Sequence, residues 1–184
     1  MEAAERQIKP FIAVSFGTST TFLDLEDVTG TKSDSSSKKN VVFGVGGAVL
    51  WDLFGFEADV AHAPGFFQSG VQPPLVIASS VTTIAGNFVV TLPRRMTEYS
   101  LRPYLVSGAG VMHVRKDDVF EALTVHETMA AIDLGGGATG FVSNTWGVCW
   151  DVRYFRGFNR EAKGLSIGPE QLSFWRASMA IVLR

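Results

Sequence analysis

The alternation of large apolar side chains with small or polar ones is the feature that most constrains this chain. In the segment from Asn40 to Trp51, one set of alternate positions carries Val41, Phe43 and Val45, and the other carries mostly small residues. Successive side chains of a strand point to opposite faces, so this pattern predicts a strand with two different environments. The pattern recurs and predicts eight strands, over residues 9–18, 40–51, 55–63, 81–92, 101–114, 128–141, 146–155 and 172–184.

The segments between these predicted strands alternate in length. Short ones cover residues 52–54, 93–100 and 143–145, and long ones cover residues 23–39, 64–80, 115–127 and 156–171. This alternation is typical of an up-and-down barrel, in which short turns gather at one end and long loops at the other. We therefore predict an all-β, eight-stranded antiparallel up-and-down barrel as a single domain over residues 7–184, preceded by an N-terminal tail over residues 1–6.

The distribution of charge between the two faces indicates which solvent surrounds this barrel. The charged strand residues share the face of the small residues, and they are Glu57, Asp59, Asp133, Asp151, Arg153 and Arg176. Eight strands leave an interior just wide enough for side chains, so the large apolar residues of the other face are expected to point outward into lipid. A closed barrel also pairs its backbone groups, as lipid requires. We predict a transmembrane β-barrel without an open pore, filled by a salt-bridge network of these six residues.

The composition agrees with a membrane protein built from strands. Charged residues make up 18% of the chain, against roughly 25% in soluble domains. No apolar run approaches the roughly 20 residues that a transmembrane helix needs. Aromatic residues near strand ends are expected to form interfacial girdles, and they are Trp51, Phe54, Phe56, Tyr99, Trp146 and Trp175.

Other features of the sequence argue against several functions. The net charge of −2 gives no sign of a nucleic-acid surface. Cys149 is the only cysteine, so it cannot form an internal disulfide. The run from Gly135 to Gly140 matches the dinucleotide pattern G-x-G-x-x-G, but no amphipathic helix follows it. We interpret these glycines as sites of close strand packing and expect no cofactor.

The histidines and serines do not form a recognisable catalytic or metal site. His62, His113 and His126 lack the spacings of known metal motifs. Nothing in the sequence fixes Ser107 or Ser173 to a histidine, so we expect no enzyme activity. A proton or ion path along the interior charges is an alternative to a purely structural network.

Three further segments are informative: Arg102–Gly110, Leu134–Gly137, and Trp146–Val148 with Asp151–Gly157. They resemble a known family, the small outer-membrane β-barrels that include the OmpA-type and OmpX-type proteins. The resemblance implies a location in the outer membrane of Gram-negative bacteria. It places the N-terminus and the short turns in the periplasm and the four long loops outside. The chain departs from the family at its end, Ile181–Arg184, where such barrels usually carry an aromatic residue.

The beginning of the chain bears on its export. Met1-Glu2-Ala3-Ala4-Glu5 lacks the basic start and the apolar stretch of a signal peptide. Because an outer-membrane barrel must be exported, we expect this sequence to be the mature form.

Function is expected to lie in the loops, because the barrel itself is a scaffold. The second long loop is unusually apolar, and Phe66, Phe67, Leu75 and Ile77 are its candidate contacts for lipid, a protein partner or a hydrophobic ligand. We predict a structural or surface-interaction role. One alternative is a carrier or narrow channel for a small hydrophobic solute. A second is a soluble lipocalin-like binder, whose apolar face would point inward.

Overall fold

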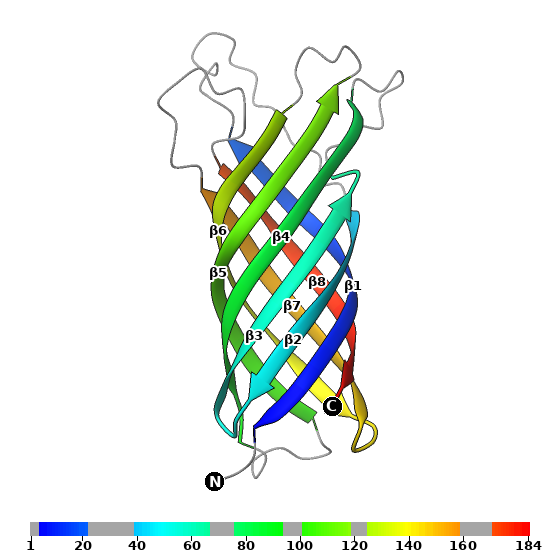
Figure 1. Cartoon of the computed structure of the whole chain (residues 1–184), viewed down its shortest axis with the longest axis vertical. Helices are drawn as coiled ribbons and strands as arrows, with labels where there is room; N and C mark the ends of the chain where they lie inside the picture. The colour runs from blue at the N-terminus through cyan, green and yellow to red at the C-terminus, as the bar shows by residue number, and fades with distance from the viewer. Residues whose placement is uncertain (1–3, 22–38, 67–75, 94–100, 119–124, 159–170) are drawn as a thin grey trace.

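Eight strands form a closed barrel in the computed structural model, which describes residues 4–21, 39–66, 76–93, 101–118, 125–158 and 171–184. Each strand pairs antiparallel with its neighbours in the sequence, and the first strand pairs with the last to close the barrel (Figure 1). The strands are β1 (Glu5–Thr21), β2 (Asn40–Leu50), β3 (Phe54–Pro64), β4 (Val76–Thr91), β5 (Leu101–Asp118), β6 (Val125–Phe141), β7 (Trp146–Phe158) and β8 (Gln171–Leu183). The predicted fold class is confirmed. Among the described residues, no helix is long and apolar enough to cross a membrane.

The two ends of the barrel differ in what they carry. Both chain termini lie at one end, which we call the terminal end (Figure 1). The tight β2–β3 and β6–β7 connections also lie there, and backbone hydrogen bonds from Trp51 to Phe54 and from Val142 to Trp146 close them. We call the opposite end, from which the β1–β2, β3–β4, β5–β6 and β7–β8 connections leave, the distal end.

The strands extend further toward the distal end than the sequence predicted. β4 begins at Val76 and β5 continues to Asp118, so the connections predicted over 64–80 and 115–127 are shorter than expected. Conversely, the connection over 92–100, predicted to be short, is longer than the one over 119–124. Two features conceal these strand ends in the sequence: a register shift between Val76 and Ala78, and the polar run from Arg115 to Asp118. β1 begins at Glu5, within the predicted tail.

Large apolar side chains cover the outer wall of the barrel. Leu105, Leu134 and Trp150 are 67%, 63% and 54% exposed, and apolar neighbours on every strand share this exposure. Inward positions alternate with them, as the burial of Glu57 and Asp59 between Phe56 and Val60 on β3 illustrates. This arrangement is the reverse of the one that the lipocalin-like alternative requires.

The interior is filled in layers from the terminal to the distal end. Arg102 lies at the terminal end and donates hydrogen bonds to the carbonyl oxygens of Trp51, Asp52 and Leu92. An apolar layer with a tyrosine follows, made of Ala48, Leu50, Val89, Tyr104, Val106, Cys149, Ala180 and Val182. A layer of paired charges, which we call the charged layer, occupies the middle and includes Glu57, Asp59, Asp151, Arg153 and Arg176. A second apolar layer, including Met112, Met129, Phe155, Leu172 and Phe174, lies toward the distal end.

The glycine run that matches the dinucleotide pattern lies within β6, where no helix follows it. A Cβ atom at Gly137 would lie 2.2 Å from the carbonyl oxygen of Trp150, and one at Gly135 would lie 2.4 Å from that of Val152. These glycines therefore allow β6 and β7 to approach closely, as the sequence interpretation expected.

Candidate functional site

The charged layer is built around Arg153 on β7. Its guanidinium donates hydrogen bonds to Glu57 at 2.5 Å, to Asp151 at 2.9 Å and to Asp59 at 3.4 Å. All four side chains are buried, with at most 6% of their surface exposed. One cation thus holds three carboxylates, which satisfies the rule that buried charges must be paired.

Arg176 on β8 forms the second half of this layer. Its Nη1 atom donates to Oδ1 of Asp59 at 3.1 Å. The guanidinium also stacks on two rings, 4.9 Å from the centre of Phe11 and 4.5 Å from that of Phe155. An arginine between two aromatic rings is stabilised by cation–π attraction, which is strongest where water is excluded. Arg176 therefore joins the charged layer to the aromatic side chains above it.

Sequence analysis missed two members of this layer. Lys9 on β1 pairs with Glu57, and its ammonium lies 5.5 Å from the centre of the Tyr104 ring. Tyr104 on β5 donates to Asp151 at 2.9 Å, and its hydroxyl lies 3.1 Å from the sulfur of Cys149. Lys9 lies an even number of positions from the buried Ala13 on β1, and Tyr104 lies two residues from the buried Val106 on β5. Strand alternation could therefore have placed both side chains inside the barrel.

Asp133 on β6 differs from the other five predicted residues. Its side chain is buried, with 3% of the residue exposed, yet its Oδ2 atom has no hydrogen-bond partner in the part of the chain that the structure describes. It takes part in none of the ion pairs found among the described residues. The structure therefore brings together Glu57, Asp59, Asp151, Arg153 and Arg176, and it leaves Asp133 buried beside them without an ion-pair partner.

The charged layer leaves little free space. The cavity bounded by Lys9, Glu57, Asp151, Arg153 and Arg176 has room for about one water molecule. The apolar layers lie on both sides of it. Among the described residues, no group of three His, Cys, Asp or Glu side chains could hold a metal ion. The geometry suits a rigid plug that holds opposite walls of the barrel together.

The apolar second loop differs from the sequence expectation. Phe66 is not an exposed contact: it is 4% exposed and packs edge-on against Phe174 inside the barrel, with ring centres 5.3 Å apart. The preceding Gly65, with φ 68°, turns the chain, and its N–H donates to the carbonyl of Ser79. Ile77 lies in β4 rather than in a loop. Phe67 and Leu75 lie outside the described residues.

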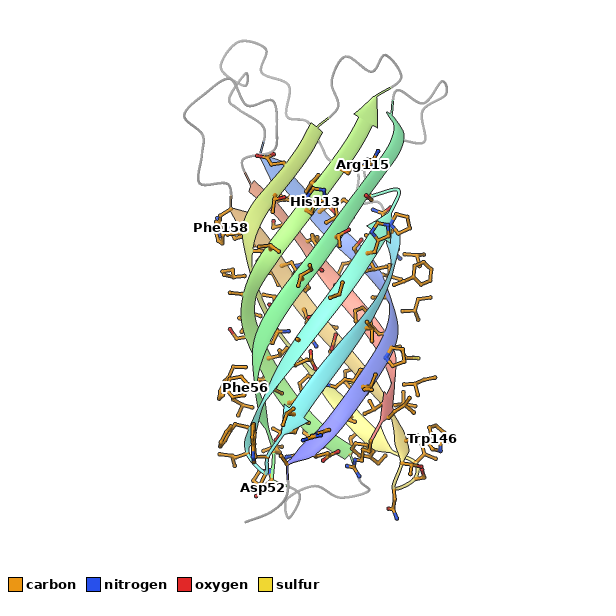
Figure 2. The ribbon with its side chains drawn as sticks, in the orientation of Figure 1. Asp52, Phe56, His113, Arg115, Trp146 and Phe158 are labelled. Atoms are coloured by element: carbon orange, nitrogen blue, oxygen red, sulfur yellow. The ribbon has the colours of Figure 1, made fainter. Side chains whose placement is uncertain are left out.

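The outer wall carries a cluster of aromatic side chains near the terminal end. Near the terminal end, Trp51 stacks on Phe54 at 5.4 Å and contacts Phe56 edge-on at 6.3 Å. Figure 2 shows Phe56 and Trp146 at this end, on opposite sides of the barrel, and His113 and Arg115 toward the distal end. The predicted girdle residue Tyr99 lies outside the described residues.

No protein-family model and no curated protein matches this chain, but solved structures do. The structure of Neisserial surface protein A (NspA) is 11% identical and covers 99% of both chains, with a TM-score of 0.71. The attachment invasion locus protein Ail of Yersinia pestis, in complex with the heparin analogue sucrose octasulfate, is 14% identical. It covers 99% of this chain and all of Ail, with a TM-score of 0.56. The outer membrane enzyme PagL is 13% identical and covers 93% of this chain and 97% of its own, with a TM-score of 0.51.

The fold and the apolar outer wall together show to which class of protein this chain is similar. The chain has the fold of the small eight-stranded outer-membrane β-barrels, and its wall carries the apolar surface that such barrels present to lipid. The family resemblance noted in the sequence is confirmed at the level of the fold. Proteins of this fold include NspA and Ail as well as the enzyme PagL, so the fold alone does not define an activity.

Proposed function

We propose that this chain is a bacterial outer-membrane protein with a sealed barrel, and that it serves as a scaffold for interactions at the cell surface. The observation that carries this proposal is the inversion of its two faces. Exposed side chains such as Leu105 and Leu134 form the wall, while ion pairs such as Arg153–Glu57 fill the interior. Exposing so large an apolar wall to water would be unfavourable, whereas contact with the acyl chains of a bilayer is favourable.

The sealed interior favours a scaffold over a channel or a carrier. A solute would have to pass the ring stack of Phe155 and Phe174, whose centres are 5.3 Å apart, and then the guanidinium of Arg153. Both side chains are buried, and the cavity beside Arg153 has space for about one water molecule. Displacing these groups would break several buried ion pairs at once, which is costly.

In the proposed orientation, the terminal end faces the periplasm and the distal end faces outward. The crystallised complex of Ail with a heparin analogue supports an external interaction role for a barrel of this fold. The outer membrane enzyme PagL, which has a similar fold, supports the alternative that a barrel of this kind carries an active site. We propose that this chain is not an enzyme, because its cysteine is buried and its two described histidines are hydrogen-bonded to threonines rather than to a serine or a cysteine. The buried Cys149 contacts only the hydroxyl of Tyr104 among the hydrogen-bonding partners found.

Site-directed cysteine labelling tests the orientation. Cys149 is 3% exposed and gives little background. A membrane-impermeant maleimide added to intact cells should label a Ser36→Cys variant, in the β1–β2 connection, but not an Asn144→Cys variant, in the β6–β7 turn. Both should react after lysis. Labelling of Asn144→Cys alone in intact cells would contradict the proposal.

Electrical recording tests the sealed interior. The protein reconstituted in a planar bilayer should give no steady unit conductance, while a porin added afterwards should conduct in the same membrane. A reproducible unit conductance from the purified protein would support the narrow-channel alternative instead.

A further inference from the structure

A row of polar side chains crosses the outer wall near the distal end. His62 on β3 is in register with Thr82 on β4, Thr82 with His113 on β5, and His113 with Thr128 on β6. We call these four residues the outer polar row. His62, His113 and Thr128 are exposed, and Thr82 is half-buried. Four adjacent strands thus present polar groups where the wall below them is apolar.

The two histidines of the outer polar row are held in place by its threonines. Nδ1 of His62 lies 2.9 Å from Oγ1 of Thr82, and Nδ1 of His113 lies 2.9 Å from Oγ1 of Thr128. In each pair the hydrogen bond joins neighbouring strands and fixes the orientation of the imidazole ring. The same histidine–threonine contact therefore occurs twice on this wall.

A permanent cation lies just above this row. Arg115 is two residues beyond His113 on β5, and its side chain is exposed on the same face. Its register partner on β4 is the half-buried Ser80, whose hydroxyl adds another hydrogen-bonding group. Figure 2 shows Arg115 above His113, on the distal side. Together these residues offer one guanidinium, two imidazoles and several hydroxyls.

The position of the row corresponds to the edge of a bilayer. From Phe54 in the aromatic cluster of the terminal end to His62, β3 rises about 20 Å along the barrel axis at the usual rise and tilt of a strand. The apolar band of an outer-membrane barrel is about 25 Å tall. His62 therefore lies about 5 Å inside the distal edge of this band, and Arg115, which is level in register with Pro64 two residues beyond His62, lies at the edge, where acyl chains give way to headgroups. The opposite edge carries a cluster of aromatic side chains.

We propose that His62, His113 and Arg115 form a site on the outer wall for the phosphate group of an anionic lipid in the leaflet around the distal end. Arginine matches the geometry of phosphate oxygens, and imidazole and hydroxyl groups supply further donors. Cationic side chains near a membrane surface attract anionic lipids. This inference rests on the proposed function, because it requires the barrel to span a bilayer.

Lipid selectivity measured by electron spin resonance tests the site. The protein is reconstituted in phosphatidylcholine membranes that contain a trace of spin-labelled phosphatidic acid or spin-labelled phosphatidylcholine. The wild type should prefer phosphatidic acid, by about fivefold for each cation that contributes. The variant with His62→Gln, His113→Gln and Arg115→Gln should lose most of this preference. The matched control Arg6→Gln, which removes an exposed cation of the terminal end, should keep it.

The other outcomes have distinct meanings. An unchanged preference in the triple variant, or no preference in the wild type, would overturn the site. If inorganic phosphate at millimolar concentration abolished the preference, the site would bind a free anion rather than a lipid headgroup, which would also overturn the proposal. Slower migration on boiling in SDS serves as the insertion check for every variant. A wild type that fails this check would contradict the proposed function itself, whereas an inserted wild type without preference would contradict only this inference.

Discussion

Arg153 on β7 reaches across the barrel to Glu57 on β3, and the two side chains meet at 2.5 Å. Three strands separate β3 from β7 in either direction around the closed sheet. The same guanidinium contacts Asp59 and Asp151. A single side chain therefore connects opposite walls and pairs with three carboxylates. Glu57 and Asp59 have a second cation in Lys9 and Arg176, whereas Asp151 has no other ion-pair partner among the described residues.

Replacing Arg153 with Met should destabilise the folded barrel by about 3–5 kcal/mol, because it leaves buried carboxylates without their partner. Urea unfolding in lipid vesicles, followed by tryptophan fluorescence, measures the change. The control Arg6→Met removes an exposed arginine and should cost less than about 1 kcal/mol. Equal losses in the two variants would show that the interior pairing does not stabilise the barrel.

Asp133 and Asp59 should respond in opposite ways to the same substitution. Asp59 accepts hydrogen bonds from Asn87, Arg153 and Arg176, so Asp59→Asn should lower stability by about 2 kcal/mol or more. Asp133 is buried without an ion-pair partner among the described residues, so Asp133→Asn removes an unpaired charge and should leave stability equal or higher. The same urea unfolding assay compares them. A larger loss for Asp133→Asn than for Asp59→Asn would contradict this account of the charged layer.

Two strand glycines offer a test of close packing. A Cβ atom at Gly110 would lie 1.9 Å from the carbonyl oxygen of Ile84, whereas one at Gly47 would meet nothing within 4 Å. Gly110→Ala should therefore lower stability by about 1–3 kcal/mol. Gly47→Ala should be neutral or slightly stabilising, because alanine restricts the unfolded chain more than glycine does. The midpoint of urea unfolding distinguishes them, and a harmless Gly110→Ala would contradict the packing of β4 against β5.

The depth of a wall residue in the bilayer should determine how strongly a charge at that position destabilises the barrel. Leu134 lies midway along β6 between Phe141 at the short turn and Thr128 in the outer polar row, and it is 63% exposed. Leu134→Arg should cost about 2–4 kcal/mol in vesicles, because it places a charge near the bilayer midplane. Leu53→Arg, in the β2–β3 turn, should cost about 0–1 kcal/mol, as expected near the interface. Equal costs would mean that the wall does not face acyl chains.

The sequence was informative about strands and faces because both are local properties. Alternation along β3 requires only the identities of Phe56, Glu57, Ala58 and Asp59, and it placed each of them on the face where the structure has it. Six inward charged residues were identified in this way. The alternation carries no information about neighbours across the barrel.

Pairing inside the barrel could not be predicted, because it depends on register and closure. Lys9 on β1 reaches Glu57 on β3 across β2, where their register partners are the small residues Gly46 and Ala48. Asp133 has no ion-pair partner among the described residues, although its side chain faces inward like those of the charged layer. Phe66 turns inward because of the bend at Gly65 and the ring of Phe174 on β8. These are contacts between distant parts of the chain, and local patterns do not reveal them.

Quenching of tryptophan fluorescence by brominated lipid tests the central claim, that the apolar wall faces the bilayer. The chain has four tryptophans, and Trp51, Trp146, Trp150 and Trp175 are all exposed on this wall. In vesicles of lipid brominated on its acyl chains, most of the emission should be lost relative to unbrominated vesicles, while aqueous iodide should quench little. Emission that brominated lipid leaves intact and iodide quenches strongly would place these side chains in water and contradict the account.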